Sequence, residues 1–391
     1  MNPLSQTAMA EATRLTTEGR LDEAMALLRG AISGASEVDA EPQPAPSKAR
    51  QFIDMVPPSP ATGGCWTSPF HTAAHSGSAP KSARPFPGLH PRTPPAGATV
   101  LPKGARFEQL AFANEAGSRH YKLYIPSGFT GQSVPLVMML HGCTQSPDDF
   151  AAGTRMNLLA EEFGFLVAYP AQPKSSNPSK CWNWFRPGDQ RRGQGEPAVI
   201  AGIAQQIAKD YPISRAQIYV AGLSAGGAAA AIMGAAYPDI FAAVGVHSGL
   251  ACGAASDIPS AFSAMRQGNS RANAYRRNGF SRPVPTIVFH GDGDSTVSPV
   301  NGDQVIAQAK AGVELMRTVE SGESLGGIKY TRVSEKDQGG RTVLEHWTLH
   351  GCGHAWSGGS AEGSYTEPRG PDASREMIRF FFRHRSSGGD S

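Results

Sequence analysis

Short apolar runs alternate with segments of helical periodicity between about residues 105 and 385, and this alternation strongly constrains the fold. Runs such as "VPLVMML" and "QIYVAG" are apolar at successive positions, which is typical of strands buried on both faces of a parallel sheet. The first two runs, "RFEQLAFA" and "RHYKLYIP", alternate in polarity and predict an antiparallel hairpin. The expected strands are 106–113, 119–126, 134–142, 165–171, 217–222, 243–249, 285–291 and 345–351.

Helical patterns separate these strands, and strand–helix alternation predicts an α/β fold with a mostly parallel, twisted sheet covered by helices on both faces. Ligands of such sheets bind beyond the carboxyl ends of the strands. Five strands end in the polar segments "LHGC", "YPAQ", "AGLSAG", "HSG" and "HGDGD", which we expect to gather at one edge. The expected helices are about 154–163, 196–210, 226–236, 302–316 and 374–384.

The remainder of the chain has a different composition. Residues 34–104 are dense in proline, alanine, serine and glycine, so they bury too little apolar surface to order themselves and predict a disordered linker. Residues 1–33 show helical spacing on both sides of Gly19 and predict a helical hairpin-like segment, with docking to a partner or granule as its expected role. One copy of this pattern is too few for a helical repeat domain. The expected folded domain is 105–385, followed by a flexible tail at 386–391.

Charge and hydropathy exclude several partners. The 391 residues have a net charge of +3 and no polybasic run, so nucleic acids and anionic membranes are poor candidates. No run of about 18 apolar residues occurs, so no membrane span is expected. The N-terminus lacks a basic segment followed by a continuous apolar block and is not a recognisable secretory signal.

The strand "QIYVAG" runs directly into the motif Gly222-Leu223-Ser224-Ala225-Gly226 and then into the helical segment "GGAAAAIMGAAY". A strand, a Gly-x-Ser-x-Gly motif and a helix form a nucleophile elbow, in which a sharp turn exposes the serine oxygen above the sheet. The alternative is a helix N-cap, because serine is a favoured capping residue. We favour Ser224 as a nucleophile.

The segment "LHGCTQ", which ends an earlier apolar run, is the candidate oxyanion loop. A tetrahedral oxyanion needs N–H donors placed beside the nucleophile. The backbone amides of Cys143 and Ala225 are the expected donors, since Ala225 follows the serine. The alternative is an ordinary strand-end turn in which His141 packs or caps.

The segment "FHGDGDSTVSP" follows a late strand and offers a carboxylate that can support a histidine base. Asp292 and Asp294 both qualify. Asp292 precedes a glycine, and Asp-Gly is a strong turn signal, so we favour Asp294 as the acid.

The base is expected after the acid, because the order of an elbow-type triad is Ser, Asp, His. His346 and His350 lie within a strand pattern, and His384 lies near the end of the last helix. His354 lies in the glycine-flanked loop of "LHGCGHAWSGG", just past a strand, and is the favoured base.

Six segments together carry a family resemblance: "LHGCTQSPDDFA", "CWNWF", "GLSAGG", "YPDIFAAVGVHSG", "HGDGDSTV" and "GCGHAWSGG". They resemble the polyhydroxybutyrate (PHB) depolymerase and feruloyl esterase group of α/β-hydrolases over about residues 106–384. The resemblance implies an α/β-hydrolase fold and a carboxylic-ester hydrolase with Ser224 as nucleophile, Asp294 as acid and His354 as base. It suggests a polyester of 3-hydroxybutyrate, or short esters like it, as substrate, and the mechanism needs no metal or organic cofactor.

Three tryptophans are candidate substrate contacts. Trp182 and Trp184 alternate around Asn183, so an extended segment turns both to one side, either as an exposed substrate wall or as two core residues. Trp356 lies two residues past the candidate base and is expected to line the pocket.

No C-x-x-C motif occurs among the five cysteines, which argues against a zinc or thioredoxin-like site. We expect pairs Cys143–Cys181 and Cys252–Cys352, each pinning a functional loop, with two buried thiols as the alternative for each; Cys65 is interpreted as an incidental thiol. Disulfides and the family resemblance indicate an extracellular protein, whereas the missing signal peptide favours the cytoplasm.

The sequence therefore predicts a serine esterase of the PHB depolymerase type acting on a polyester or a small ester. The alternative of the same fold is a feruloyl or acetyl xylan esterase, and a peptidase is a weaker third option. A rival of another class is a non-enzymatic, granule-associated interaction protein that uses its helical N-terminus.

Overall fold

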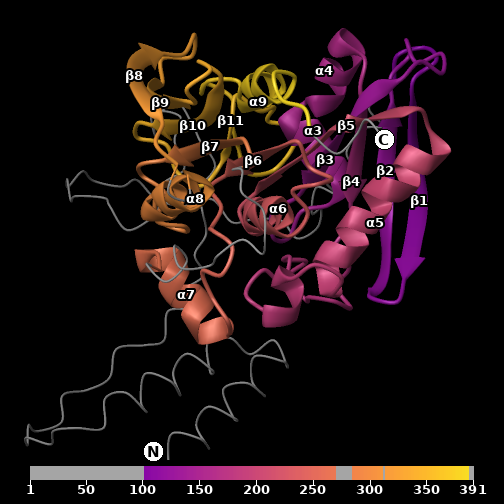
Figure 1. Cartoon of the computed structure of the whole chain (residues 1–391), viewed down its shortest axis with the longest axis horizontal. Coiled ribbons are helices and arrows are strands. Elements are labelled where there is room, and N and C mark those ends of the chain that lie inside the picture. The colour runs from indigo at the N-terminus through magenta and orange to yellow at the C-terminus, as the bar shows by residue number, and fades with distance from the viewer. Residues whose placement is uncertain (1–100, 270–283, 311–312, 387–391) are drawn as a thin grey trace, which may run out of the picture. The chain divides into compact units, whose positions relative to one another are not determined.

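In the part of the chain that the structure describes, ten strands form one sheet in the order β1-β2-β4-β3-β5-β6-β7-β10-β9-β8 (Figure 1). The structure is a computed structural model that describes residues 101–269, 284–310 and 313–386. The predictions for residues 1–33, for nearly all of 34–104 and for most of the tail lie outside the described residues. The strands are β1 (Arg106–Asn114), β2 (Gly117–Ile125), β3 (Val134–Leu140), β4 (Leu166–Pro170), β5 (Ile213–Leu223), β6 (Ala243–His247), β7 (Thr286–Gly291), β8 (Met316–Glu323), β9 (Lys329–Lys336) and β10 (Thr342–Leu349).

The centre of the sheet is parallel, as the continuous apolar runs predict. β4, β3, β5, β6, β7 and β10 pair in parallel, while β1 with β2 and β8 with β9 form antiparallel hairpins at the two edges. The carboxyl ends of the six parallel strands therefore meet at one edge, which carries the polar segments noted in the sequence. The predicted α/β-hydrolase architecture is confirmed.

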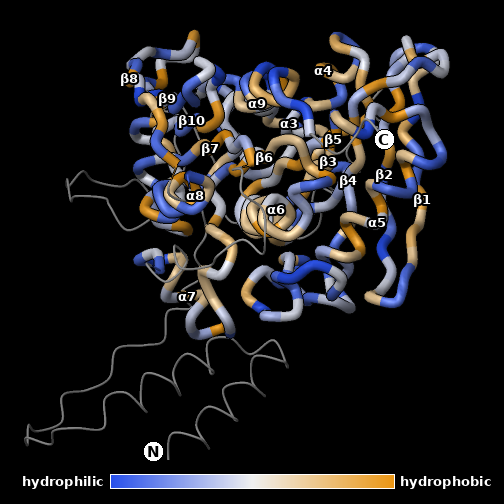
Figure 2. Tube along the Cα trace, viewed as in Figure 1, coloured by the Kyte–Doolittle hydropathy of each residue, from blue (hydrophilic) through white to orange (hydrophobic). Residues whose placement is uncertain are grey.

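Helices cover both faces of the sheet (Figure 1). In β5, Ile218 and Val220 belong to the core shared with α5 and α6, whereas Tyr219 and Ala221 belong to the core shared with α4 and α9. This alternation buries both faces, and Figure 2 shows apolar residues concentrated along the central strands. The helices are α3 (Pro147–Thr154), α4 (Met156–Phe163), α5 (Gly195–Asp210), α6 (Ala225–Ala236), α7 (Ile258–Gln267), α8 (Val300–Lys310) and α9 (Ala373–Phe381).

Several elements were not expected from the sequence. β8 and β9 form an edge hairpin, and nearly every residue of β8 is exposed, so this strand carries no continuous apolar run. The predicted helix 154–163 corresponds to α4, whereas α3 was not predicted; Arg155, in the left-handed conformation with φ 54°, separates the two helices. The helix α7, the short 3-10 turn η2 (Pro187–Gln190) and the two-residue strands β11 (Trp356–Ser357) and β12 (Thr366–Glu367) were also not predicted.

Candidate active site

Ser224 lies at the turn between β5 and α6, in a conformation with φ 58° and ψ −119°. Such backbone strain costs about 1–3 kcal/mol in a non-glycine residue and persists only where the surroundings hold it. The Ser224 N–H donates to the carbonyl oxygen of His247 on the neighbouring strand β6 at 2.9 Å. Although Ser224 occupies the N-cap position of α6, its side chain makes no capping hydrogen bond, so capping does not explain this serine.

The two glycines of the motif allow the elbow to lie against the end of β3. A Cβ on Gly222 would lie 2.2 Å from the carbonyl oxygen of Gly226. A Cβ on Gly226 would lie 2.0 Å from the carbonyl oxygen of Leu140 and 2.6 Å from that of His141. The contact partners are backbone atoms, which cannot rotate away as a flexible side chain can. Both glycines are therefore required for the turn and for its contact with the candidate oxyanion loop.

Replacing Gly226 by alanine is expected to displace the elbow from β3. We expect the free energy of unfolding to fall by about 2–3 kcal/mol through overpacking. A shift of the nucleophile by about 1 Å can lower kcat by about 100-fold. Urea denaturation and ester hydrolysis measure the two effects. Gly128→Ala is the matched control, because a Cβ there meets nothing within 4 Å; a Gly226→Ala enzyme with wild-type stability and kcat would contradict the packing argument.

His354 and Asp294 form a buried pair, with 2.7 Å between His354 Nδ1 and Asp294 Oδ2 and side-chain exposures of 7% and 0%. Asp294 Oδ1 accepts the backbone N–H groups of Thr296 and Val297 at 2.9 and 2.8 Å. Burial raises the pKa of Asp294, but the charge of His354 and hydrogen bonds from His290 and His354 outweigh it and hold that pKa well below its usual range. The carboxylate therefore stays charged beside the imidazole, as support of a general base requires.

A second histidine–aspartate pair lies on the surface. His350 Nδ1 lies 2.8 Å from Asp292 Oδ2, and both side chains are 42% exposed. The other two candidate bases, His346 and His384, are largely buried, and burial lowers the pKa of each to about 4. The distances alone do not separate the two pairs, so their position relative to Ser224 has to decide.

His247, the last residue of β6, joins the elbow to the loop that carries His354. Its carbonyl oxygen accepts the Ser224 N–H, and its ring Nε2 accepts the N–H of Ser357 at 3.0 Å. Burial, followed by the charges of His290 and His354, lowers the pKa of His247 well below its usual range. The neutral ring can therefore serve as an acceptor. The loop that carries His354 is thus hydrogen-bonded to the same residue that accepts the Ser224 N–H, and Asp294 and His354 remain our candidates for the acid and the base.

The candidate oxyanion donors follow two adjacent strands. Cys143 comes just after β3, and Ala225 is the first residue of α6, where N–H groups have no partner within the helix. A Cβ on Gly142 would lie 3.5 Å from the carbonyl oxygen of Leu223, so the two segments are in contact. The Gly142 N–H donates to Gln145 Oε1 at 2.9 Å, which shapes the turn before Cys143. Sequence reasoning missed Gln145, although it is the last residue of the quoted motif.

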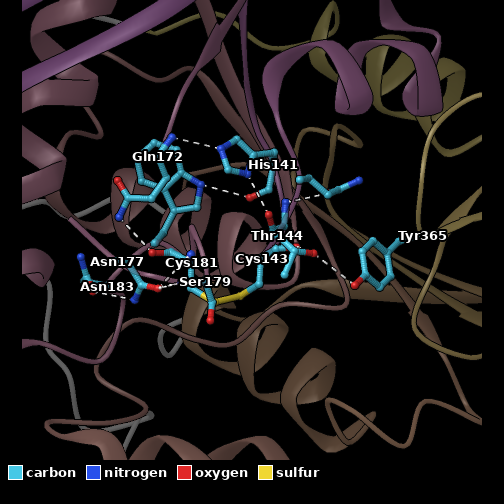
Figure 3. Close-up of a disulfide and its surroundings, with 12 residues drawn as sticks. His141, Cys143, Thr144, Gln172, Asn177, Ser179, Cys181, Asn183 and Tyr365 are labelled. Carbon is cyan, nitrogen blue, oxygen red and sulfur yellow. Dashed lines mark hydrogen bonds between the residues drawn. A yellow bond between two sulfur atoms is a disulfide. The ribbon is translucent and has the colours of Figure 1, made fainter. Parts of the chain in front are cut away.

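A disulfide between Cys143 and Cys181 ties the candidate oxyanion loop to a second loop, and it confirms the predicted pairing (Figure 3). Beside it, the Thr144 N–H donates to the carbonyl oxygen of Ser179 at 2.7 Å. On the other side, the Thr144 and Tyr365 hydroxyl groups are 3.2 Å apart (Figure 3). The loop is thus held from both sides, by a covalent bond and by hydrogen bonds.

His141 has a structural role in the same network (Figure 3). Its Nε2 accepts the backbone N–H of Gln172 at 3.1 Å, so Nδ1 carries the hydrogen and donates to the carbonyl oxygen of Gly142 at 2.7 Å. Burial lowers the pKa of His141 to about 4, which keeps the ring neutral. The His141 carbonyl oxygen accepts the indole N–H of Trp182 at 3.0 Å.

A buried carboxylate holds the loop that carries Cys181. Glu196 accepts the backbone N–H of Asn183 at 2.7 Å and its side-chain amide at 2.8 Å, and Gln172 also donates to it. The guanidinium of Arg119 lies 3.4 Å away. Burial raises the pKa of Glu196, and the nearby Asp189 adds to this effect. The hydrogen bonds compensate the carboxylate for its loss of water.

Opening the disulfide is expected to lower both stability and activity. The two cysteines are 38 residues apart, and loops of this size are stabilised by roughly 3–4 kcal/mol through the constraint on the unfolded chain. Cys143→Ser/Cys181→Ser should therefore unfold at lower urea concentration than the wild type. Reductant should lower the wild-type midpoint and leave that of the double variant unchanged. An unchanged wild-type midpoint after complete reduction would contradict the prediction.

The three tryptophans are buried, so for Trp182 and Trp184 the structure agrees with the alternative of two core residues and not with an exposed substrate wall. Trp182 and Trp184 lie in the core on the α5 and α6 side, with exposures of 0% and 6%. Trp356 is 1% exposed in the other core, where its indole N–H donates to Ser374 Oγ at 3.0 Å. Side chains covered in this way offer almost no surface to an ester. We therefore do not propose them as substrate contacts.

No disulfide joins Cys252 to Cys352, and the second predicted pairing is wrong. Both side chains are buried, but Cys252 belongs to the core on the α5 and α6 side of the sheet and Cys352 to the core on the opposite side. The sheet therefore separates two residues that the sequence left free to pair.

Among the described residues, no three His, Cys, Asp or Glu side chains gather in a way that could hold a metal ion. None of the helices in the same part of the chain is both long and apolar enough to span a bilayer.

The elbow on a largely parallel sheet, with serine, aspartate and histidine following in that order, is the pattern of serine hydrolases with the α/β-hydrolase fold. The chain belongs to the family described as "Esterase PHB depolymerase", because the model of that family matches residues 119–318.

Curated relatives are named as depolymerases or esterases. The chain is 33% identical over 251 residues to a poly(3-hydroxyalkanoate) depolymerase C from Paucimonas lemoignei, covering 62% of this chain and 60% of that protein. It is 30% identical over 264 residues to a feruloyl esterase B from Thermothelomyces thermophilus, covering 63% of this chain and 87% of that protein. The chain thus spans less than two thirds of the depolymerase and most of the feruloyl esterase.

Solved structures support the fold. An acetyl xylan esterase from Aspergillus awamori superposes with a TM-score of 0.58 at 20% identity, covering 71% of this chain and 99% of that one. At this level of identity the similarity concerns the fold alone.

Proposed function

We propose that this chain is a serine carboxylic-ester hydrolase that works through an acyl-enzyme on Ser224. The observation that carries the proposal is a connected set of contacts around the strained Ser224 turn. The Ser224 N–H donates to His247, and the His247 ring accepts a hydrogen bond from the loop that carries His354. His354 in turn contacts the buried Asp294 carboxylate. A neutral serine hydroxyl is a poor nucleophile, and an adjacent histidine supported by a carboxylate is the usual way to activate it.

The proposed reaction is a double displacement. His354 Nε2 takes the proton from Ser224 as its oxygen attacks the ester carbonyl. The backbone amides of Cys143 and Ala225 stabilise the oxyanion, and the positive end of α6 adds to this effect. The alcohol leaves with the proton from His354, and a water molecule, activated by the same histidine, hydrolyses the acyl-enzyme.

Polyesters of 3-hydroxybutyrate, or short hydroxyacyl esters, are the proposed substrates. Support comes from the family description and from the relative named poly(3-hydroxyalkanoate) depolymerase C. Feruloyl and acetyl esters are the second candidates, because the feruloyl esterase B relative is matched over 87% of its length and other sequence relatives are named acetylxylan esterase.

Hydrolysis of hydroxybutyrate oligomers, compared with methyl ferulate and acetylated xylan, tests the substrate class. We expect the largest kcat/KM on the oligomers; a larger value on either of the other two would reassign the substrate. A fluorophosphonate, which reacts with activated serines, tests the enzyme class. A folded wild-type protein that is neither labelled nor active would favour the non-enzymatic interaction protein.

A further inference from the structure

His290 is a buried histidine to which the reaction above gives no role. It is the residue before the end of β7, four residues before Asp294, and its side chain is 1% exposed. Its Nε2 lies 2.8 Å from the carbonyl oxygen of Val297 and 3.5 Å from Asp294 Oδ2. Both neighbours are acceptors, so Nε2 must carry a hydrogen and direct it toward them.

Two imidazole rings therefore face the same oxygen of Asp294. Oδ1 is already occupied by the N–H groups of Thr296 and Val297. Oδ2 is approached by His354 from the loop after β10 and by His290 from β7. With donors on both oxygens, the carboxylate cannot rotate about its bond to Cβ without losing hydrogen bonds.

The other side of the His290 ring does not explain its orientation. Among the described residues, Nδ1 has no hydrogen-bond partner. A Cβ on Gly302 of α8 would lie 3.0 Å from this nitrogen and 3.1 Å from Nε2 of His346, so α8 packs closely against both rings.

The titratable groups around His290 are His247 on β6, His346 on β10, and Asp294 and His354 in the site; Asp303 on α8 lies 3.5 Å from His346. The polar contacts that fix the ring are those of Nε2.

We propose that His290 is a positioning residue that orients the Asp294 carboxylate toward His354. When the proton of Ser224 moves to His354, the imidazolium develops charge opposite Asp294 Oδ2. A carboxylate already held in place stabilises that charge without reorganisation. This inference rests on the proposed function, and its effect falls on kcat because the ring has no proposed contact with substrate.

His290→Gln and His290→Asn form a matched pair that separates the two ring nitrogens. The glutamine amide reaches the position of Nε2, whereas the asparagine amide reaches only that of Nδ1, which faces α8. We expect His290→Asn to lower kcat on a soluble ester by about 10- to 100-fold with KM within about twofold of wild type. His290→Gln should retain kcat within about threefold of wild type. His290→Leu replaces His290→Asn as the variant without a donor if the latter does not fold.

A double-mutant cycle with Asp294→Asn tests whether His290 acts through the acid. We expect no further loss of kcat from His290→Asn in that background. His350→Gln, in the exposed histidine–aspartate pair, is the control and should keep wild-type kcat. Three results would each overturn the proposal. The first is an equal loss of kcat in His290→Gln and His290→Asn, and the second is wild-type kcat in His290→Asn. The third is a His290→Asn effect that is undiminished in the Asp294→Asn background. An inactive wild-type enzyme would instead refute the proposed function.

Discussion

Replacing Ser224 by alanine is expected to lower kcat for ester hydrolysis by about 10⁴- to 10⁶-fold, because the covalent pathway is lost. The free energy of unfolding should change little, since the serine side chain makes no capping hydrogen bond. KM for a soluble ester should stay close to the wild-type value. Steady-state kinetics and fluorophosphonate labelling measure the effect, and labelling should disappear completely.

Ser224→Gly is the informative companion variant. Glycine tolerates the φ of 58° and ψ of −119° far better than serine does, so this variant should be more stable than wild type by about 1 kcal/mol while remaining inactive. Such a result would show that the turn stores strain for the sake of the nucleophile. A glycine variant no more stable than alanine would argue against stored strain, and substantial residual hydrolysis by either variant would exclude Ser224 as the nucleophile.

The parallel core could be predicted because central strands such as β3 are apolar along their whole length. A strand such as β3 can satisfy that pattern only when helices cover both faces of the sheet. The edge hairpin β8–β9 was missed for the opposite reason. β8 is exposed on nearly every residue, and its pairing with β9 depends on backbone hydrogen bonds that leave no apolar period in the sequence.

The predictions about tryptophan and cysteine side chains failed because they depend on the face of the sheet on which each side chain lies. The sequence alone does not give that face. Trp356 was expected to line the pocket because it lies two residues past the candidate base, but its indole is buried and its N–H donates to Ser374. Cys252 and Cys352 were expected to pair, but they lie on opposite faces. The position of a residue near a functional motif in the sequence predicts that it lies at the same edge of the sheet. It does not predict the direction in which the side chain points.

His247 and His290 illustrate a further limit of sequence reasoning. Each ends or nearly ends a buried strand, and a lone histidine in that position is most simply interpreted as structural. Only the register of the parallel strands, which sets His247 beside both Leu223 and Phe289, places it next to Ser224. The signal available in the sequence was the polar residue at each strand end.

Replacing Asp294 by asparagine is expected to lower kcat by about 10⁴-fold, whereas Asp292→Asn should stay within about threefold of wild type. The asparagine Oδ1 can still accept the N–H groups of Thr296 and Val297, so its amide nitrogen must face His354. Nδ1 of His354 then has to accept a hydrogen bond, which places the ring hydrogen on Nε2. Nε2 is the nitrogen that must be unprotonated to take the proton from Ser224. The comparison of the two asparagine variants on one soluble ester therefore decides between the buried and the exposed histidine–aspartate pair.

The same substitution is expected to change the pH dependence of stability. The pKa of Asp294 lies well below its usual value of about 3.9 because the charge of His354 and the hydrogen bonds from His290 and His354 outweigh the effect of burial. A carboxylate with a lowered pKa in the folded state stabilises the protein above the unfolded-state pKa, and this contribution is lost as the pH falls through the folded-state value. Asp294→Asn should therefore be less stable than wild type at pH 7, with the difference shrinking below about pH 4. Urea midpoints measured from pH 3 to pH 7 test this. A difference that is constant with pH would mean that Asp294 is not held as a charged group, and its proposed role as the acid would then fail as well.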